Sequence, residues 1–520
     1  MKKTRIISAV LAACMFAGSC ITNHPASAWI PDSELPYAES YIEYGDVNLD
    51  LWVDVADAVM VARFYAMDYT LQITDLGKRM GDVNLDGNLD DDDLRQILEY
   101  IAHKRTALGV ADSPVEHLYQ AVNLTEQTES GEATGKEADE AFISSQMKLT
   151  VGLFKGSAAD RQSKGQNVLI SPLSISQALA MTANGANGET KTEMEKLLGD
   201  TIKMDELNRY YYDYTADLTG SEDAALHLAN SIWINNKSET LQVRTPFLQT
   251  AKDYYRSEVF AAPFDDSTLN DVNNWVNTNT HEMIPKLLDT LDPQTQMILI
   301  NALAFEAEWY NPYRADREYD KTFHADTGDM TATLMYSDER TYLEDEKATG
   351  FIKPYEGGRY SFAALLPNED VSLSEYIEGM TPESLQAFLN SKRSEEVVAA
   401  IPKFEDDYSI TLDDVLKKLS MESAFTDGAD FSELNAKKDS KIDTVLHKTF
   451  VKVDERGTKA GAVTAVMIAP TSAIPEDTPQ PKYVILDRPF IYMILDNKTN
   501  LPVFIGYVLH PTAVEAAEAE

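Results

Sequence analysis

The stretch that decides the fold is Asp454-Glu455-Arg456-Gly457-Thr458-Lys459-Ala460-Gly461-Ala462-Val463-Thr464-Ala465-Val466-Met467-Ile468. Side chains alternate between the two faces of a strand, so one face carries only uncharged, mostly small residues: Thr458, Ala460, Ala462, Thr464, Val466 and Ile468. Such a face fits beneath a crowded sheet surface. Prolines at 470, 475, 479 and 481 follow, and proline is excluded from central strands. The stretch therefore predicts either an insertable strand joined to an exposed loop, or a plain edge strand followed by a linker.

The pattern around this stretch is mixed. Helical periodicity is expected over 142–154, 175–181, 190–198 and 271–288. Apolar strands are expected over 168–170, 297–305, 445–453, 483–486, 490–495 and 501–509. Early helices with strands throughout predict an α+β domain.

Several short motifs are spread through this domain in a fixed order. They are Asn167 to Ser176, Asn301 to Phe305 with Trp309, Ile401 to Phe404, His447-Lys448, Asp454 to Thr458, Arg488 to Phe490 and Phe504 to Pro511. Together, in this order and spacing, they resemble the serpin family (serine protease inhibitors) over residues 137–513. The resemblance implies the α+β serpin fold, with multi-stranded β-sheets, surrounding helices and an exposed reactive loop.

In serpins a protease cleaves the reactive loop and forms an acyl-enzyme, and the cleaved loop then inserts into the main sheet. The resemblance makes the following residues the reactive-loop hinge: Glu455, Gly457, Thr458, Ala460, Ala462 and Thr464. The family spacing places the reactive bond between Thr471 and Ser472, or within one or two residues of it. Small residues at the bond indicate elastase-like or subtilisin-like serine proteases as targets, and a cysteine protease is a further option. The domain is expected to be a monomer and an inhibitor, not an enzyme.

The serpin shutter region, where the main sheet parts, is matched by Ser171, Ser174, Asn301 and His447. A serine hydrolase is the competing interpretation, but no Gly-x-Ser-x-Gly sequence is present. His447 is therefore expected to be a buried hydrogen-bonding residue and not a catalytic base.

A short repeat near the N-terminus indicates calcium binding. Residues 45–50 recur as 81–86, an offset of 36. Each copy has the oxygen-ligand spacing of a twelve-residue EF-hand loop, and such hard ligands suit Ca²⁺. The predicted ligands are Asp46, Asn48, Asp50, Trp52 (carbonyl), Asp54 and Asp57, and then Asp82, Asn84, Asp86, Asn88 (carbonyl), Asp90 and Asp93. Leu51 replaces the glycine of the sharp turn, so the first site is expected to be weaker.

Each loop runs into an amphipathic segment, 55–65 and 92–101, and no helix is expected before either loop. This arrangement resembles a dockerin module over residues 40–108. The resemblance implies binding to a cohesin domain of a scaffoldin, with Val55, Ala56, Asp91 and Asp92 at the positions that help to choose the partner. Val55 is expected to make the hydrophobic contact, with internal packing as the alternative. Residues 109–136 are polar and are expected to form a flexible linker.

The first 28 residues have the pattern of a signal peptide. A basic start and a short apolar stretch precede Ala26-Ser27-Ala28. A lipoprotein box ending at Cys14, which would be lipidated, is the alternative. Cys14 and Cys20 are the two cysteines, so cleavage after Ala28 leaves a chain without thiols. No other apolar window is long enough to span a membrane.

The composition excludes some partners. Asp and Glu number 85 and Lys and Arg 45, giving a net charge of −40 that repels nucleic acid and anionic membranes. The sequence thus predicts a secreted, extracellular, scaffold-associated suicide inhibitor of serine proteases. The alternative is a non-inhibitory serpin-fold binding or structural protein on the same cellulosome-like assembly.

Overall fold

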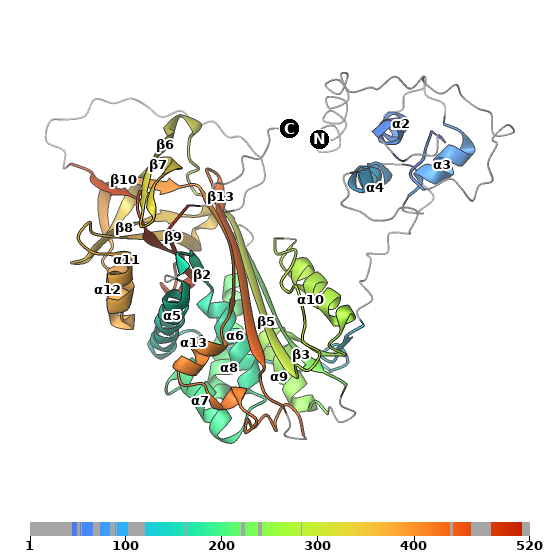
Figure 1. Ribbon diagram of the computed structural model, residues 1–520, viewed down its shortest axis with the longest axis horizontal. Coiled ribbons are helices and arrows are strands. Elements are labelled where there is room, and N and C mark those ends of the chain that lie inside the picture. Colours follow the sequence, from blue (N-terminus) through green and yellow to red (C-terminus); the bar gives the residue numbers. More distant parts are fainter. Residues whose placement is uncertain are drawn as a thin grey trace. The chain divides into compact units, whose positions relative to one another are not determined.

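The computed structural model describes residues 44–48, 53, 55–65, 73–83, 89, 91–101, 120–161, 164–219, 224–237, 242–281, 283–436, 440–458 and 480–511. The chain divides into two compact units, Met1–Leu118 and Tyr119–Glu520, and each is described by itself (Figure 1). Within the described residues no helix has the length and apolar character needed to cross a membrane.

The smaller unit contains three helices, α2 (Val55–Tyr65), α3 (Asp75–Gly81) and α4 (Asp91–Ile101). Its core repeats at the offset of 36 that the sequence shows. The buried side chains form the matching pairs Val47 and Val83, Ala58 and Leu94, and Val61 and Ile97. Helices α2 and α4 pack against each other, so neither copy has to bury its apolar face alone.

Helix α3 corrects one expectation, because it directly precedes the second loop. It begins after Thr74, whose Oγ1 accepts a hydrogen bond from the Gly77 amide at 2.9 Å. At seven residues α3 is too short to display an apolar period over two turns, and its N-cap was the available sequence signal.

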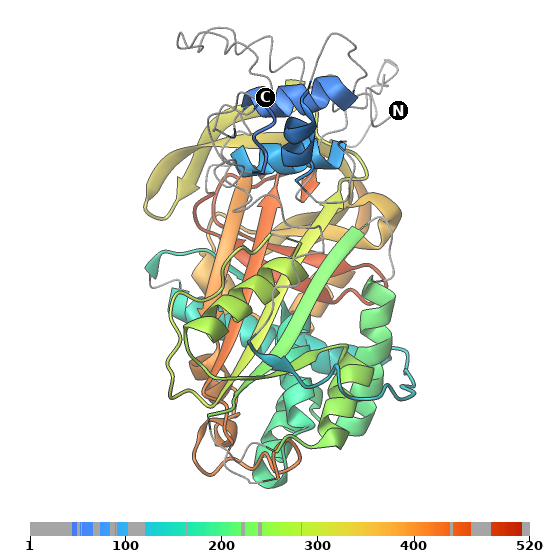
Figure 2. The same cartoon turned by 90° about the vertical axis from the view of Figure 1, so that its right-hand side faces the viewer.

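The larger unit is built on a seven-stranded sheet in the order β1-β4-β3-β5-β13-β12-β11. Its strands are β1 (Val122–Asn123), β3 (Ala224–Asn235), β4 (Glu258–Ala262), β5 (Met297–Glu308), β11 (Phe404–Thr411), β12 (Thr444–Val453) and β13 (Gly457–Thr458). Helix α10 (Asp266–Asn279) lies across one face of this sheet, while α6 (Pro172–Ala183) and α8 (Met204–Thr219) lie behind the other (Figures 1 and 2).

A second, nine-stranded sheet has the order β14-β10-β7-β8-β9-β15-β16-β2, with β6 paired to β7. Its strands are β2 (Val168–Ile170), β6 (Glu318–Ala325), β7 (Gly328–Glu344), β8 (Ala348–Pro354), β9 (Tyr360–Pro367), β10 (Arg393–Pro402), β14 (Lys482–Ile485), β15 (Phe490–Asp496) and β16 (Pro502–Val508). Every residue of β9, β15 and β16 is buried, which explains why these strands are almost entirely apolar.

The other helices are α5 (Glu140–Arg161), α7 (Gly188–Gly199), α9 (Thr245–Tyr255), α11 (Leu373–Gly379), α12 (Pro382–Asn390) and α13 (Asp413–Lys418). Three short 3₁₀ turns are Ala315–Arg317, Glu356–Gly358 and Ser423–Phe425. The helix expected over 271–288 is α10, which ends at Asn279 because Thr280 turns the chain: its Oγ1 donates to the Val276 carbonyl and accepts from the Ile284 amide.

Residues 120–136 differ from the flexible linker expected from their composition. Strand β1 pairs antiparallel with β4, and the Ala121 amide donates to Asp271 of α10 at 2.8 Å. Lys252 of α9 donates to the carbonyls of Thr125 and Thr128. The segment is held mainly by hydrogen bonds to its backbone and buries few apolar side chains, Ala121 and Leu124 among them, so composition alone gave no sign of its order.

Lys252→Met is expected to loosen this segment. The change keeps the apolar stem but removes two hydrogen bonds from a charged donor, a loss of about 1–3 kcal/mol in the free energy of unfolding. Hydrogen exchange of residues 120–136 should become faster and the melting temperature should fall. The exposed control Lys196→Met should change neither, and equal protection in both variants would contradict this role.

Candidate functional site

The main sheet is parted at one end by the first residues of the alternating stretch. Gly457 lies opposite Glu308 and Thr458 opposite Ala307 of β5, while Thr458 also pairs with Val453 of β12. Beyond this point β5 and β12 pair directly and in parallel, residues 298–304 against 444–450. The first two residues of the predicted strand thus lie between β5 and β12, and past them the two strands pair directly with each other.

Gly457 allows this wedge to form. An ideal Cβ at this position would lie 2.1 Å from the Ala307 carbonyl oxygen and 2.7 Å from the Glu308 Cα, both of them backbone atoms. The turn before it is held by the Asp454 carboxylate, which accepts the Arg456 amide at 2.9 Å. Glycine is therefore required here because the two backbones approach closely, and not because the position has a positive φ.

Thr458 is fully buried, and its hydroxyl lies 2.7 Å from the Tyr355 hydroxyl. The Tyr355 ring stacks on Trp309 with centroids 4.4 Å apart. Trp309 in turn donates from Nε1 to the Asp454 carbonyl at 2.9 Å. This aromatic pair therefore holds both ends of the turn and fixes the side on which Thr458 enters.

A partly exposed ion pair ties the hinge to a neighbouring strand. The Lys403 ammonium lies 2.7 Å from Glu455 and 2.9 Å from Glu318. Because both glutamates share one cation at the surface, the stabilisation is about 1 kcal/mol or less.

A row of polar side chains crosses the sheet where β5 and β12 pair. Asn230 of β3 lies opposite Asn301 of β5, and Asn301 lies opposite His447 of β12. The Asn301 amide donates to Asn230 and to Ser174 of α6, and its oxygen is bonded to His447 Nδ1. All these side chains are buried, so the row satisfies its hydrogen bonds only while the strands stay paired.

The partners of His447 fix its protonation state. The Ser171 amide donates to His447 Nε2 at 3.0 Å, so the proton is on Nδ1, which donates to Asn301. Burial lowers the pKa of His447 to about 3. Ser171 and His447 meet through the Ser171 backbone amide and not its hydroxyl, and both residues are fully buried. The predicted shutter residues are thus brought together, and their arrangement is that of a structural network without an accessible nucleophile.

Acid is expected to weaken the fold through His447. The unfolded side chain has a pKa of about 6.5 and is protonated between pH 6.5 and 3, whereas the folded side chain stays neutral there. The free energy of unfolding therefore decreases by up to about 1.4 kcal/mol for each unit that the pH is lowered through this range. Asp406 acts in the opposite sense, because burial raises its pKa to about 6 and stability rises as it is protonated.

The measurement is the urea midpoint from pH 7 to pH 5. His447→Gln should lose part of the acid-induced fall, whereas the exposed His324→Gln should keep it all. An identical pH profile for the His447 variant would contradict the assignment.

The rest of the predicted reactive loop lies outside the described residues. This holds for the hinge residues Ala460, Ala462 and Thr464 and for the reactive bond between Thr471 and Ser472. Glu455, Gly457 and Thr458 are the described members of the hinge.

In the small unit the last ligand of each predicted calcium loop is placed equivalently. Asp57 Oδ1 accepts the Val47 amide at 2.8 Å, and Asp93 Oδ1 accepts the Val83 amide at 2.9 Å. Asp46, Asp57 and Asp93 are fully buried. Asp46 and Asp57 belong to the first loop and Asp93 to the second, and carboxylate oxygens at these loop positions fit a divalent cation.

The other predicted ligands are only partly described. Asn48 and Asp82 lie at the described loop starts, but Asp50, Trp52, Asp54, Asn84, Asp86, Asn88 and Asp90 fall outside the described residues. Within the described part alone, no three acidic or histidine side chains form a metal-binding group. Val55 is 51% exposed and so is not packed internally, and Ala56 is exposed beside it at the start of α2. Asp91 and Asp92 occupy the first turn of α4.

Some residues of the site were missed from the sequence. Asn230 completes the polar row, and Tyr355 contacts the hinge threonine. The sequence could have indicated Asn230, because it is the one polar residue among the apolar residues on the inward face of β3, Leu226, Leu228, Ile232 and Ile234. Tyr355 lies 103 positions from Thr458, and no local sequence pattern indicated this contact.

The fold and site define an α+β protein in which the short strand β13 separates the ends of β5 and β12 in the main sheet. A family model described as "Serpin (serine protease inhibitor)" matches residues 144–511. The chain belongs to the serpin family. It is 31% identical to an uncharacterized serpin-like protein of Thermococcus kodakarensis over 70% of this chain and 84% of that one. It is 28% identical to human alpha-1-antichymotrypsin over 80% of this chain and 99% of that protein.

Two solved states of one relative bear on the conformation. The native state of the thermophilic serpin tengpin matches with 43% identity and a TM-score of 0.71, covering 75% of this chain and all of that one. Its latent state matches with 43% identity and a TM-score of 0.63, covering 73% of this chain and all of that one. The TM-score is thus higher for the native state than for the latent state.

Proposed function

We propose that the chain is a secreted suicide inhibitor of serine proteases, acting by cleavage and insertion of its reactive loop. The observation that carries the proposal is the wedge formed by Gly457 and Thr458 between β5 and β12. If the strand continued in the register of Gly457 and Thr458, each later residue would have a defined partner on β5 and on β12. Family membership supports the same activity, since serpins are protease inhibitors and not enzymes.

Continuing the register from Thr458 would place Ala460 beside Phe305, Ala462 beside Leu303 and Thr464 beside Asn301. These positions of β5 face the main core, so the small side chains would enter the crowded face. Lys459 and Val463 would point to the opposite face, where alternate residues of β12 are half-buried. Each residue of the alternating stretch therefore matches the face that it would meet.

Thr464 gives this register a chemical fit. It would enter between Asn301 and His447, whose hydrogen bond must break for the strand to pass. A hydroxyl both donates and accepts, so Thr464 could satisfy both groups. The inward set has threonine at two positions, and Thr458 already has its polar partner in Tyr355.

Ala462→Arg is expected to convert the inhibitor into a substrate. An unpaired guanidinium on the core face costs several kcal/mol, so insertion would stall and the acyl-enzyme would hydrolyse. Gel analysis with the target protease should show cleavage with the covalent adduct reduced at least about tenfold. Thr458 is a poorer choice because it is already part of the sheet.

Val463→Arg is the matched control, since it adds the same charge one residue along on the opposite face. It should keep most of the adduct. Equal loss of adduct in both variants would contradict the proposed register, and persistent adduct in Ala462→Arg would contradict insertion itself.

The proposed reactive bond, Thr471–Ser472, has a small residue on each side. Shallow primary pockets accept such residues, so we infer elastase-like or subtilisin-like targets. The alternative, a non-inhibitory serpin-fold protein, has less support, because the inward positions of the hinge carry no charge or proline.

We further propose that the small unit is a dockerin that binds Ca²⁺ and anchors the inhibitor to a cohesin on a cellulosomal scaffoldin. The support is the matched placement of Asp57 and Asp93 in the two loops and the exposed Val55 on α2. Bound Ca²⁺ would take these carboxylate oxygens as ligands. The signal-like first 28 residues support export to the cell exterior.

Calcium titration of the full chain should show two sites, with Asp57→Asn and Asp93→Asn each removing one. The exposed control Asp427→Asn should leave both. Chelation with EDTA should abolish cohesin binding and spare protease inhibition, because the inhibitor unit contains none of the predicted ligands. Loss of inhibition as well would contradict the two-module account.

A further inference from the structure

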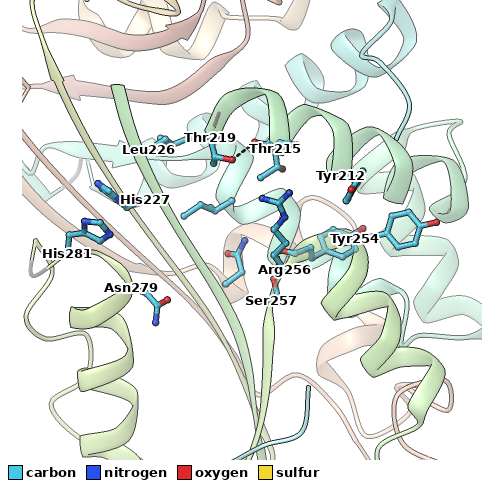
Figure 3. A pocket seen from close by; sticks show the side chains of 14 residues that line it. Tyr212, Thr215, Thr219, Leu226, His227, Tyr254, Arg256, Ser257, Asn279 and His281 are labelled. Carbon is cyan, nitrogen blue, oxygen red and sulfur yellow. Dashed lines mark hydrogen bonds between the residues drawn. The ribbon is translucent and has the colours of Figure 1, made fainter. Parts of the chain in front are cut away.

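A cavity of about 300 Å³ lies in the large unit, and its described lining residues do not include Glu455, Gly457 or Thr458 (Figure 3). It is formed at the outer edge of β3, between α8, the end of α9 and the end of α10. Strand β4 joins β3 only from Ser231 onward, and no other described strand pairs with this edge ahead of that point. The cavity is at the lower end of the volumes typical of small-molecule sites.

The described lining residues of this cavity include a cation and no acidic side chain, although the protein as a whole is acidic. The chain carries 85 acidic residues, yet none is among the 14 described residues that line the cavity. Arg256, His227 and His281 all line it. The Arg256 side chain is exposed and makes no hydrogen bond or ion pair with any described residue. A guanidinium with no carboxylate among the described lining residues favours an anionic group.

The backbone holds two of these side chains in an uncommon conformation. Arg256 ends α9 with φ of 49°, and His281 follows α10 with φ of 50°. Residues other than glycine rarely adopt this left-handed region. The His281 ring packs on His227 with centroids 3.8 Å apart, so it is held at the cavity wall (Figure 3).

The remaining wall is aromatic and apolar with scattered hydrogen-bonding groups. Tyr212 and Tyr254 meet edge to face at 6.1 Å, to one side of Arg256 in Figure 3. Leu226 and Leu228 contribute apolar surface, and the polar groups of this wall come from Thr215, Thr219, Asn230, Ser257 and Asn279. A flat ring with a hydroxyl group would contact these side chains while its charged group met Arg256.

We propose that this cavity is a binding site for a small aryl carboxylate, with Arg256 binding the carboxylate and Tyr212 and Tyr254 contacting the ring. The proposal does not rest on the inhibitory function, although Asn230 belongs both to this cavity wall and to the polar row.

The test is isothermal titration calorimetry of the full chain with three probes. Para-hydroxycinnamate should bind with a Kd of about 1 mM or below, a value suited to so small a ligand. Its neutral amide and acetate should bind at least about tenfold more weakly, because each lacks either the charge or the ring.

Arg256→Gln should weaken para-hydroxycinnamate binding at least about tenfold, as should Tyr254→Ala. The control Arg314→Gln, an exposed arginine outside the cavity wall, should bind like the unchanged protein. Equal binding of the three probes, no binding by para-hydroxycinnamate, or full binding by Arg256→Gln would each overturn the proposal. Unchanged melting temperatures would show that the variants are folded.

Discussion

The direct pairing of β5 with β12 is the interaction on which the rest of the structure depends. It closes the main sheet immediately below Thr458, the last described residue of the hinge. A strand can enter there only by breaking this ladder, and it then forms a ladder on each side, so two sets of backbone hydrogen bonds replace one. The closed sheet is thus a state that the cleaved loop could improve upon.

The row of polar side chains stabilises the direct pairing of β5 with β12. Asn301 and His447 are buried and bonded across the β5–β12 junction, and Ser171 and Ser174 hold them from below. Leaving one such group unsatisfied costs about 1–3 kcal/mol, so the strands resist separation until a replacement arrives. If the register of Thr458 continued, Thr464 would lie beside Asn301 and His447, where its hydroxyl could be that replacement.

Much of the fold followed from sequence period and motif order. Strands β5, β12 and β16 and helix α2 lie where their apolar patterns predicted, and the four shutter residues are in contact. The order of residues 120–136 could not be predicted, because it depends on backbone bonds to α9, α10 and β4 that arise only in the folded protein. Asn230 and Tyr355 reach the site through tertiary pairing, so local sequence gave at most a weak signal.

The central claim is that cleavage of the loop leads to its insertion beside β5. The most direct test is to incubate the full chain with elastase and with subtilisin, followed by denaturing gel, mass spectrometry and thermal unfolding. The account predicts a stable covalent adduct with a cut at Thr471 or its neighbours, and a cleaved protein that melts well above the intact one. Cleavage at that bond with neither an adduct nor a rise in melting temperature would contradict it.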